Sequence, residues 1–137
     1  MRENVCSLKV RYDEVGVYDM AHHSNFIKWF DVALSALLEE VGLNLKWLED
    51  KQIYVPMYEI NCKYHMPVYK DDVLTIKTTV AEMGPVKIVL RYRFYKGEAL
   101  VAEATGAHIF VKSSMRPISM KKVMPDLYES FKRYLEQ

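Results

Sequence analysis

One long apolar stripe, in residues 26–41, constrains most strongly how this chain can fold. Hydrophobic side chains recur there with the spacing of a single helix face. They are Phe26, Phe30, Ala33, Leu34, Leu37, Leu38 and Val41. The spacing predicts one amphipathic helix of about 16 residues, with Ser24 or Asn25 as its N-terminal cap and Gly42 just beyond its C-terminus. Such a helix must bury its stripe against another element of the fold.

The remaining segments supply that element, because their patterns are typical of β-strands. Alternating or β-branched residues predict strands over residues 7–12, 53–64, 73–80, 86–95 and 100–111, a hairpin at residues 96–98, and short helical segments over 43–50 and 125–135. A chain of 137 residues leaves no room for a second core. We therefore predict one α+β domain, residues 1–137, with a five-stranded antiparallel sheet around or against the long helix.

Composition excludes several classes of protein. Half of the residues are hydrophobic and the net charge is +1, which argues against a disordered chain and against a nucleic-acid-binding domain. No apolar run approaches the length of a membrane span, and the first four residues are too charged to begin a signal peptide, so we expect a cytoplasmic protein. Cys6 and Cys62 lie far apart in the sequence, and we expect two free thiols.

The predicted architecture leaves surface that one copy cannot cover. A single helix cannot cover both faces of a five-stranded sheet, and the edge strands need protection from uncontrolled pairing. The ten Tyr, eight Met and five Phe are also more than a small core requires. We therefore expect a homo-oligomer, with Lys87, Arg91 and Arg93 on a solvated strand face.

The loop before the long helix concentrates groups that can do chemistry. Asp13, Glu14, Asp19, His22 and His23 lie within 11 residues of one another, directly before the helix start. The first turn of a helix offers unpaired N–H groups and a positive dipole end, which can stabilise a carbonyl oxygen as it becomes negative. A nearby carboxylate or imidazole could then attack or activate water. The same residues would also suit ordinary helix capping or a solvated loop.

Several short motifs resemble those of the hotdog-fold acyl-CoA thioesterases of the 4-hydroxybenzoyl-CoA thioesterase family. They lie at residues 11–12 (RY), 22–31 (HHSNFIKWFD), 64–67 (YHMP), 72–74 (DVL), 108–112 (HIFVK) and 116–118 (RPI). The resemblance spans nearly the whole chain. It implies a hotdog fold, acyl-CoA thioester hydrolysis, dimers with a continuous sheet that often form tetramers, and an active site at the subunit interface.

The resemblance also assigns roles to residues of the loop. It places His23 where the backbone N–H polarises the thioester carbonyl, with Tyr18, His22, Ser24 and Asn25 as further candidate contacts to the substrate. We expect no metal, because adjacent histidines seldom bind one ion and no third ligand follows at a usual spacing. We expect no other cofactor.

One departure from the family pattern affects the mechanism. The position of the family's catalytic Asp falls on Gly16, and the family's loop glycine falls on Asp19. Three interpretations remain open. Asp19 replaces the missing carboxylate as nucleophile or general base, or Glu14 supplies it, or the domain binds acyl-CoA or acyl carrier protein without efficient hydrolysis.

A basic stretch near the C-terminus is the last candidate feature. Residues 104–125 contain no acidic residue but include Lys112 and Arg116, which could hold the phosphates of coenzyme A. A solvated tail explains the same pattern. We assign His65 and His108 structural roles. The hypothesis from the sequence is thus an acyl-CoA thioesterase with Asp19, His23 and Glu14 as candidate catalytic residues, and a non-catalytic binding module is the alternative.

Overall fold

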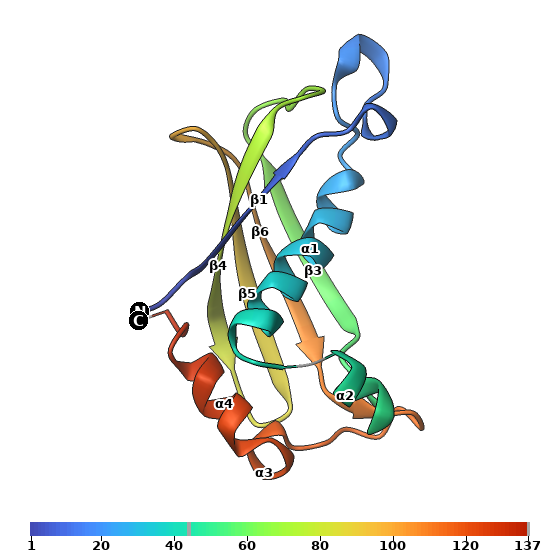
Figure 1. Ribbon diagram of the computed structural model, residues 1–137, viewed down its shortest axis with the longest axis vertical. Helices are drawn as coiled ribbons and strands as arrows, with labels where there is room; N and C mark the ends of the chain where they lie inside the picture. The colour runs from blue at the N-terminus through green and yellow to red at the C-terminus, as the bar shows by residue number, and fades with distance from the viewer. Residues whose placement is uncertain (44, 137) are drawn as a thin grey trace.

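The computed structural model describes residues 1–43 and 45–136, which form a sheet with one long helix on its inner face (Figure 1). The five antiparallel strands have the order β1-β4-β5-β6-β3. Their bounds are β1 (Asn4–Lys9), β3 (Met57–Tyr64), β4 (Val73–Met83), β5 (Lys87–Lys96) and β6 (Ala99–Ile109). A separate pair of short strands consists of β2 (Ile53–Tyr54) and β7 (Val111–Lys112). The helices are α1 (Asn25–Glu40), α2 (Leu45–Asp50), α3 (Met120–Val123) and α4 (Pro125–Lys132), and the 3₁₀ turns are η1 (Tyr12–Glu14) and η2 (Val17–Asp19).

Helix α1 confirms the prediction from the apolar stripe. Phe30, Ala33 and Leu37 are fully buried against the inner face of the sheet. The Phe30 ring stacks on the Tyr92 ring of β5, with the centroids 4.8 Å apart. Gly42 follows the helix with a φ of 84°, the left-handed conformation expected of a residue that ends a helix. The α+β class and the five-stranded antiparallel sheet are therefore confirmed.

Several strand boundaries differ from the prediction, and two of the differences follow from particular residues. We expected the first strand over residues 7–12, but β1 ends at Lys9 and Tyr12 lies in η1 with 81% of its surface exposed. The cause is Glu14, whose carboxylate accepts a hydrogen bond from the Arg11 N–H and starts a turn. We also expected one strand over 53–64. The chain instead forms β2 and β3 on either side of Pro56, which lacks an N–H for the sheet.

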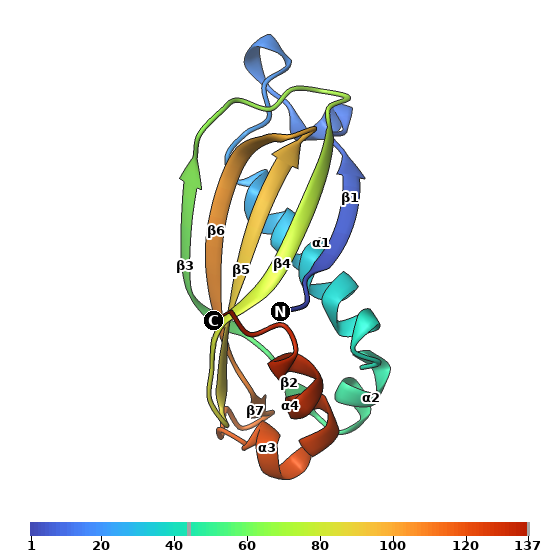
Figure 2. The same ribbon diagram turned by 90° about the vertical axis from the view of Figure 1, so that its left-hand side faces the viewer.

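The two chain ends meet beside the sheet (Figure 2). The Val80 N–H donates to the Tyr134 carbonyl, and the Glu136 N–H donates to the Val80 carbonyl. The Glu136 carboxylate then accepts hydrogen bonds from Thr79 at 2.7 Å and from Arg91 at 2.8 Å. Arg93 lies 3.7 Å away. The expectation of a simple solvated face is therefore wrong for Arg91 and Arg93, which hold the C-terminal segment.

Cys6 and Cys62 are free thiols, as expected. Among the described residues, no helix has the length and apolar character needed to cross a membrane.

The contacts of Glu136 predict a pH-dependent contribution to stability. Burial raises the pKa of its carboxyl, but the hydrogen bonds from Thr79 and Arg91 and the charges of Arg91 and Arg93 outweigh burial and lower the pKa overall. A lowered pKa stabilises the fold above the pKa of the unfolded carboxyl, about 4.3, and this stabilisation is lost as the pH falls through the folded pKa. We expect Glu136→Gln to lower the Tm by about 3 °C at pH 7 and by progressively less below pH 4.

The matched control is Glu129→Gln, because the Glu129 side chain is 65% exposed and lies 3.6 Å from Lys132. This control should leave the Tm nearly unchanged at both pH values. A Tm difference for Glu136→Gln that stays constant from pH 7 to pH 3 would contradict the assignment.

Candidate active site

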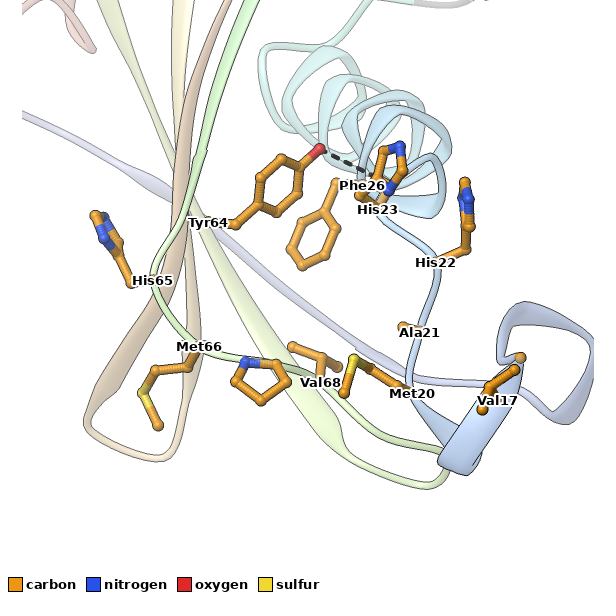
Figure 3. A pocket seen from close by; sticks show the side chains of 12 residues that line it. Val17, Met20, Ala21, His22, His23, Phe26, Tyr64, His65, Met66 and Val68 are labelled. Atoms are coloured by element: carbon orange, nitrogen blue, oxygen red, sulfur yellow. Dashed lines mark hydrogen bonds between the residues drawn. The ribbon is translucent and has the colours of Figure 1, made fainter.

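A cavity of about 550 Å³ opens at the end of the sheet where α1 begins (Figure 3). One wall is the loop before α1, and the other is the chain that leaves β3. The cavity is lined by Gly16, Val17, Met20, Ala21, His22, His23, Phe26, Tyr64, His65, Met66, Pro67 and Val68. Most of these side chains are apolar, and the imidazoles and the Tyr64 hydroxyl are the polar groups among them.

Backbone hydrogen bonds hold the two walls together. The Ala21 N–H donates to the Val68 carbonyl at 2.7 Å, and the Lys70 N–H donates to the Asp19 carbonyl at 2.9 Å. Met20 and Tyr69 form an isolated antiparallel bridge. The loop before α1 is therefore tied to the segment after β3, although about 50 residues separate them in the sequence.

Glu14 fixes the start of α1 rather than lining the cavity. One carboxylate oxygen accepts the Arg11 N–H, and the other accepts the Trp29 indole N–H at 2.8 Å. The Glu14 carbonyl accepts a hydrogen bond from the Asn25 side chain at 2.6 Å. Asn25 is itself buried and also donates to the His22 carbonyl. Both residues, which the sequence suggested for the site, hold the loop in place in this structure.

These contacts predict that Glu14→Gln destabilises the fold. The amide retains one acceptor oxygen, so it cannot accept from both the Arg11 N–H and Trp29. We expect a loss of about 1 to 2 kcal/mol of unfolding free energy, measured by urea denaturation at pH 7. Asp13→Asn is the control, because Asp13 makes an exposed ion pair with Arg11 and should change stability by less than about 0.5 kcal/mol. Equal stability of Glu14→Gln and the parent would contradict this role.

The N–H groups at the start of α1 are mostly satisfied within the turn itself. The Ser24 N–H donates to the His22 Nδ1, the Asn25 N–H to the His22 carbonyl, and the Phe26 N–H to the His23 carbonyl. Within residues 1–43 and 45–136, the His23 N–H has no hydrogen-bond acceptor. At this helix start, a single backbone N–H of a residue that lines the cavity is therefore left without an acceptor.

His22 and Ser24 form a polar pair directly before the first turn of α1. The Ser24 hydroxyl lies 2.7 Å from the His22 Nδ1, which also accepts the Ser24 N–H. Because Nδ1 is an acceptor, the proton of the neutral ring resides on Nε2. The His22 and His23 rings lie 4.1 Å apart. The side-chain cap expected from Ser24 is absent, because its hydroxyl contacts His22 instead.

Tyr64 is a site residue that the sequence reasoning did not select. Its hydroxyl donates to the His23 carbonyl at 3.1 Å, and its ring packs edge-on against Phe26 (Figure 3). Burial, followed by the neighbouring Cys62, raises the pKa of Tyr64 to about 12, so the hydroxyl remains protonated and able to donate. The sequence signal for Tyr64 was its position in the YHMP motif (residues 64–67). That motif supported the resemblance to the family and was not used to choose site residues.

The loop segment at residues 16–19, where the sequence departs from the family pattern, has an unusual backbone. Tyr18 and Asp19 adopt positive φ angles of 62° and 57°, and both side chains are exposed. The Asp19 N–H donates to the Gly16 carbonyl at 3.1 Å. Gly16 itself lines the cavity, and no described residue beyond its two chain neighbours has an atom within 4 Å of where a Gly16 Cβ would be. The wall therefore has open space at the position where the resemblance noted in the sequence predicts the catalytic carboxylate.

The remaining candidate residues lie elsewhere. Lys112 belongs to β7 at the opposite end of the sheet from the loop before α1 (Figures 1 and 2), and its ammonium donates to the Lys51 carbonyl. Arg116 is next to it, because its carbonyl accepts the Lys112 N–H.

His65 lines the cavity, with its Nε2 3.9 Å from the Glu103 carboxylate. Burial lowers the pKa of His108, whose ring is almost fully enclosed.

Among the described residues, no cluster of three or more His, Cys, Asp or Glu side chains is placed to hold a metal ion. The groups at the cavity are one free backbone N–H, the imidazoles of His22, His23 and His65, and the protonated Tyr64 hydroxyl, with Asp19 on the adjoining η2 turn outside the lining. This combination suits polarisation of a carbonyl group beside an apolar chamber.

Comparison with known proteins identifies the class. The family model of the thioesterase superfamily matches residues 18–103, and the chain belongs to this superfamily. The chain is 30% identical over 129 residues to YneP of Bacillus subtilis (strain 168), to which acyl-CoA thioesterase activity is ascribed. That alignment covers 92% of this chain and 93% of YneP.

Solved structures confirm the hotdog fold. The DHNA-CoA thioesterase from Staphylococcus aureus superposes with a TM-score of 0.91 at 21% identity, covering 97% of this chain and 91% of that one. The Staphylococcus aureus protein SAV2348, solved in complex with CoA, gives a TM-score of 0.88 at 13% identity over 99% and 87% of the two chains. The resemblance to hotdog thioesterases that the sequence indicated is thus confirmed, and the chain is a thioesterase of this fold.

Proposed function

We propose that the cavity hydrolyses acyl-CoA thioesters, releasing a carboxylic acid and coenzyme A. The observation that supports this most strongly is the free His23 N–H beside an apolar cavity at the start of α1. A thioester oxygen that accepts this N–H gains stabilisation as negative charge develops, and the positive end of α1 adds to it. The acyl group then lies among Met20, Phe26, Met66 and Val68.

Asp19 is the carboxylate that we assign to the reaction. Its N–H bond to Gly16 keeps it within one turn of the cavity wall. As a general base it removes a proton from water while the water oxygen bonds to the carbonyl carbon; the C–S bond then breaks and the CoA thiolate takes up a proton. As a nucleophile, its oxygen would instead bond to the carbonyl carbon while the C–S bond breaks and CoA thiolate leaves, and water would then cleave the resulting mixed anhydride to the acid and the free Asp19 carboxylate. Glu14 is less suited, because both of its oxygens accept structural hydrogen bonds.

The CoA phosphates require cations, and among the described residues that line the cavity there is no Lys or Arg. Lys112 and Arg116 carry suitable charges but lie at the far end of their own sheet. We therefore assign them to the active site of a second copy, in a homodimer or homotetramer. His22, Ser24 and the exposed Tyr18 are the remaining candidate contacts to the substrate at the mouth of the cavity.

A second candidate function is supported by Gly16. Because the wall is open there and carries no carboxylate, the domain could bind acyl-CoA or acyl carrier protein and release it unchanged. Turnover distinguishes the two functions, since the binding module predicts saturable binding with little or no thiol release.

The first test is hydrolysis of short, long and aromatic acyl-CoAs, followed by free-thiol release. We expect the parent to turn over at least one of them, and Asp19→Asn to lower kcat by about 100-fold or more with its fold unchanged. Asp13→Asn, an exposed carboxylate of the same loop, is the control and should remain active. Parent-like activity of Asp19→Asn would overturn the assignment to Asp19.

The second test restores the missing carboxylate. Open space at Gly16 should accept an aspartate side chain, so we expect Gly16→Asp to raise kcat, most clearly in an Asp19→Asn background. Gly16→Asn is the matched control and should not restore activity, because an amide cannot act as a base. Equal activities of the Asp and Asn variants would show that a carboxylate at this wall does not contribute.

A further inference from the structure

The imidazoles of His22 and His23 lie together at the rim of the cavity. Their ring centroids are 4.1 Å apart, and Figure 3 shows both rings apart from the apolar side chains of Met20 and Val68. His22 is exposed to solvent and also lines the cavity. A ring in this position can contact the substrate atoms that lie between the acyl group and the solvent.

Two hydrogen bonds fix the tautomer of the His22 ring. The Ser24 hydroxyl lies 2.7 Å from Nδ1, and the Ser24 backbone N–H donates to the same nitrogen at 3.2 Å. Because a backbone N–H can only donate, Nδ1 must accept, and the neutral ring carries its proton on Nε2. The Nε2–H of His22 is therefore a donor held in place by the residue that directly precedes α1.

Ser24 holds the His22 ring but does not itself reach the cavity. A hydroxyl 2.7 Å from an imidazole is also the arrangement of a nucleophile and its general base. In the described part of the chain, however, His22 lines the cavity and Ser24 does not. The geometry therefore makes Ser24 a positioning residue and leaves the His22 ring as the group that meets the substrate.

We propose that the His22 Nε2–H donates a hydrogen bond to the thioester sulfur as the C–S bond breaks. The inference rests on the proposed thioester hydrolysis and names the group that acts on the leaving thiolate. In either route for Asp19, an oxygen bonds to the carbonyl carbon and the electron pair of the C–S bond passes to sulfur. The His22 proton stays on Nε2 throughout, and the thiolate takes up its proton from the solvent.

The placement of the substrate directs its sulfur toward His22. The carbonyl oxygen accepts the His23 N–H and the acyl group lies beside Phe26, so the third substituent of the carbonyl carbon points to the rim. His22 adjoins His23 there, and the two rings are in contact. A thiolate that forms beside apolar walls is costly without a donor, and a neutral imidazole N–H can supply one.

The other polar side chains of the cavity are less suited to this role. The Tyr64 hydroxyl already donates to the His23 carbonyl at 3.1 Å, and the His65 Nε2 lies 3.9 Å from the Glu103 carboxylate. The His23 ring makes no hydrogen bond within the described part of the chain, so no contact selects its tautomer. Among the described lining residues, His22 is thus the side chain with a free and oriented N–H.

The first experiment varies the leaving group. One acyl group is presented as its CoA ester, its N-acetylcysteamine ester and an aryl thioester, because an aryl thiol has a lower pKa and its thiolate leaves more readily. We expect His22→Phe, which keeps a ring but has no N–H, to lower kcat about tenfold or more for the two alkyl thioesters and less than about twofold for the aryl thioester. His22→Gln should stay within about threefold of the parent, because its amide also donates.

Four results would contradict the donor role of His22. A loss confined to the CoA ester would show that the ring binds the nucleotide part of CoA, and an equal loss for all three thioesters would indicate a structural role. Parent-like rates of His22→Phe would exclude any role, and a His22→Gln variant as slow as His22→Phe would require proton transfer instead. A parent that hydrolyses none of the thioesters would overturn the proposed function and this inference together.

The second experiment tests Ser24 through the tautomer of the ring, by nitrogen NMR of histidine-labelled protein. At mildly alkaline pH, where a histidine is neutral, we expect the parent His22 to be protonated on Nε2 and not on Nδ1. Ser24→Ala removes one of the two donors to Nδ1, so we expect kcat to fall about threefold or more for the alkyl thioesters and to stay unchanged for the aryl thioester. Ser24→Thr keeps the hydroxyl and should match the parent.

The control for Ser24→Ala is Ser35→Ala, which removes an exposed hydroxyl from the same helix and should leave every rate unchanged. A Ser24→Ala variant as fast as Ser35→Ala with the alkyl thioesters would overturn the positioning role of Ser24. A parent ring protonated on Nδ1 would overturn the donor role of His22 as well.

Discussion

The burial of the apolar stripe of α1 against the inner face of the sheet is the contact on which the rest of the structure depends. The stacked rings of Phe30 and Tyr92 lie at the centre of that contact. Because the helix has one position on the sheet, its first turn is also fixed, and the His23 N–H lies beside the cavity. The functional site is therefore a consequence of core packing rather than of an independently folded loop.

The sequence predicted the features that local patterns control. The helix period, the glycine that ends α1 and the hairpin at Gly97 follow from spacing and backbone preference, and the structure has all three. The end of β1 and the pairing of the C-terminal segment could not be predicted, because each depends on a particular side-chain contact, the first with the Arg11 N–H in the same turn and the second between distant residues. Glu14 bonds Trp29 and Glu136 bonds Arg91, and neither pairing leaves a periodic signal.

The same distinction applies to the site. The loop before α1 was visible as a concentration of carboxylates and histidines next to a helix start, so its location was predictable. The roles of the individual residues within the loop were not predictable. Glu14 and Asn25 have the chemistry of site residues but make structural hydrogen bonds, whereas Tyr64 reaches the site from β3 through a bond to the His23 carbonyl. Gly16 leaves the wall open, and Asp19 lies on the adjoining turn.

The most direct test of this account is a crystal structure with a non-hydrolysable acyl-CoA analogue. The account predicts the carbonyl oxygen within hydrogen-bonding distance of the His23 N–H, with the acyl group in the cavity beside Phe26. A second groove is lined in part by Trp47 of α2 and by Met124, which directly precedes α4. An analogue with its carbonyl in that groove, away from the start of α1, would contradict the central claim.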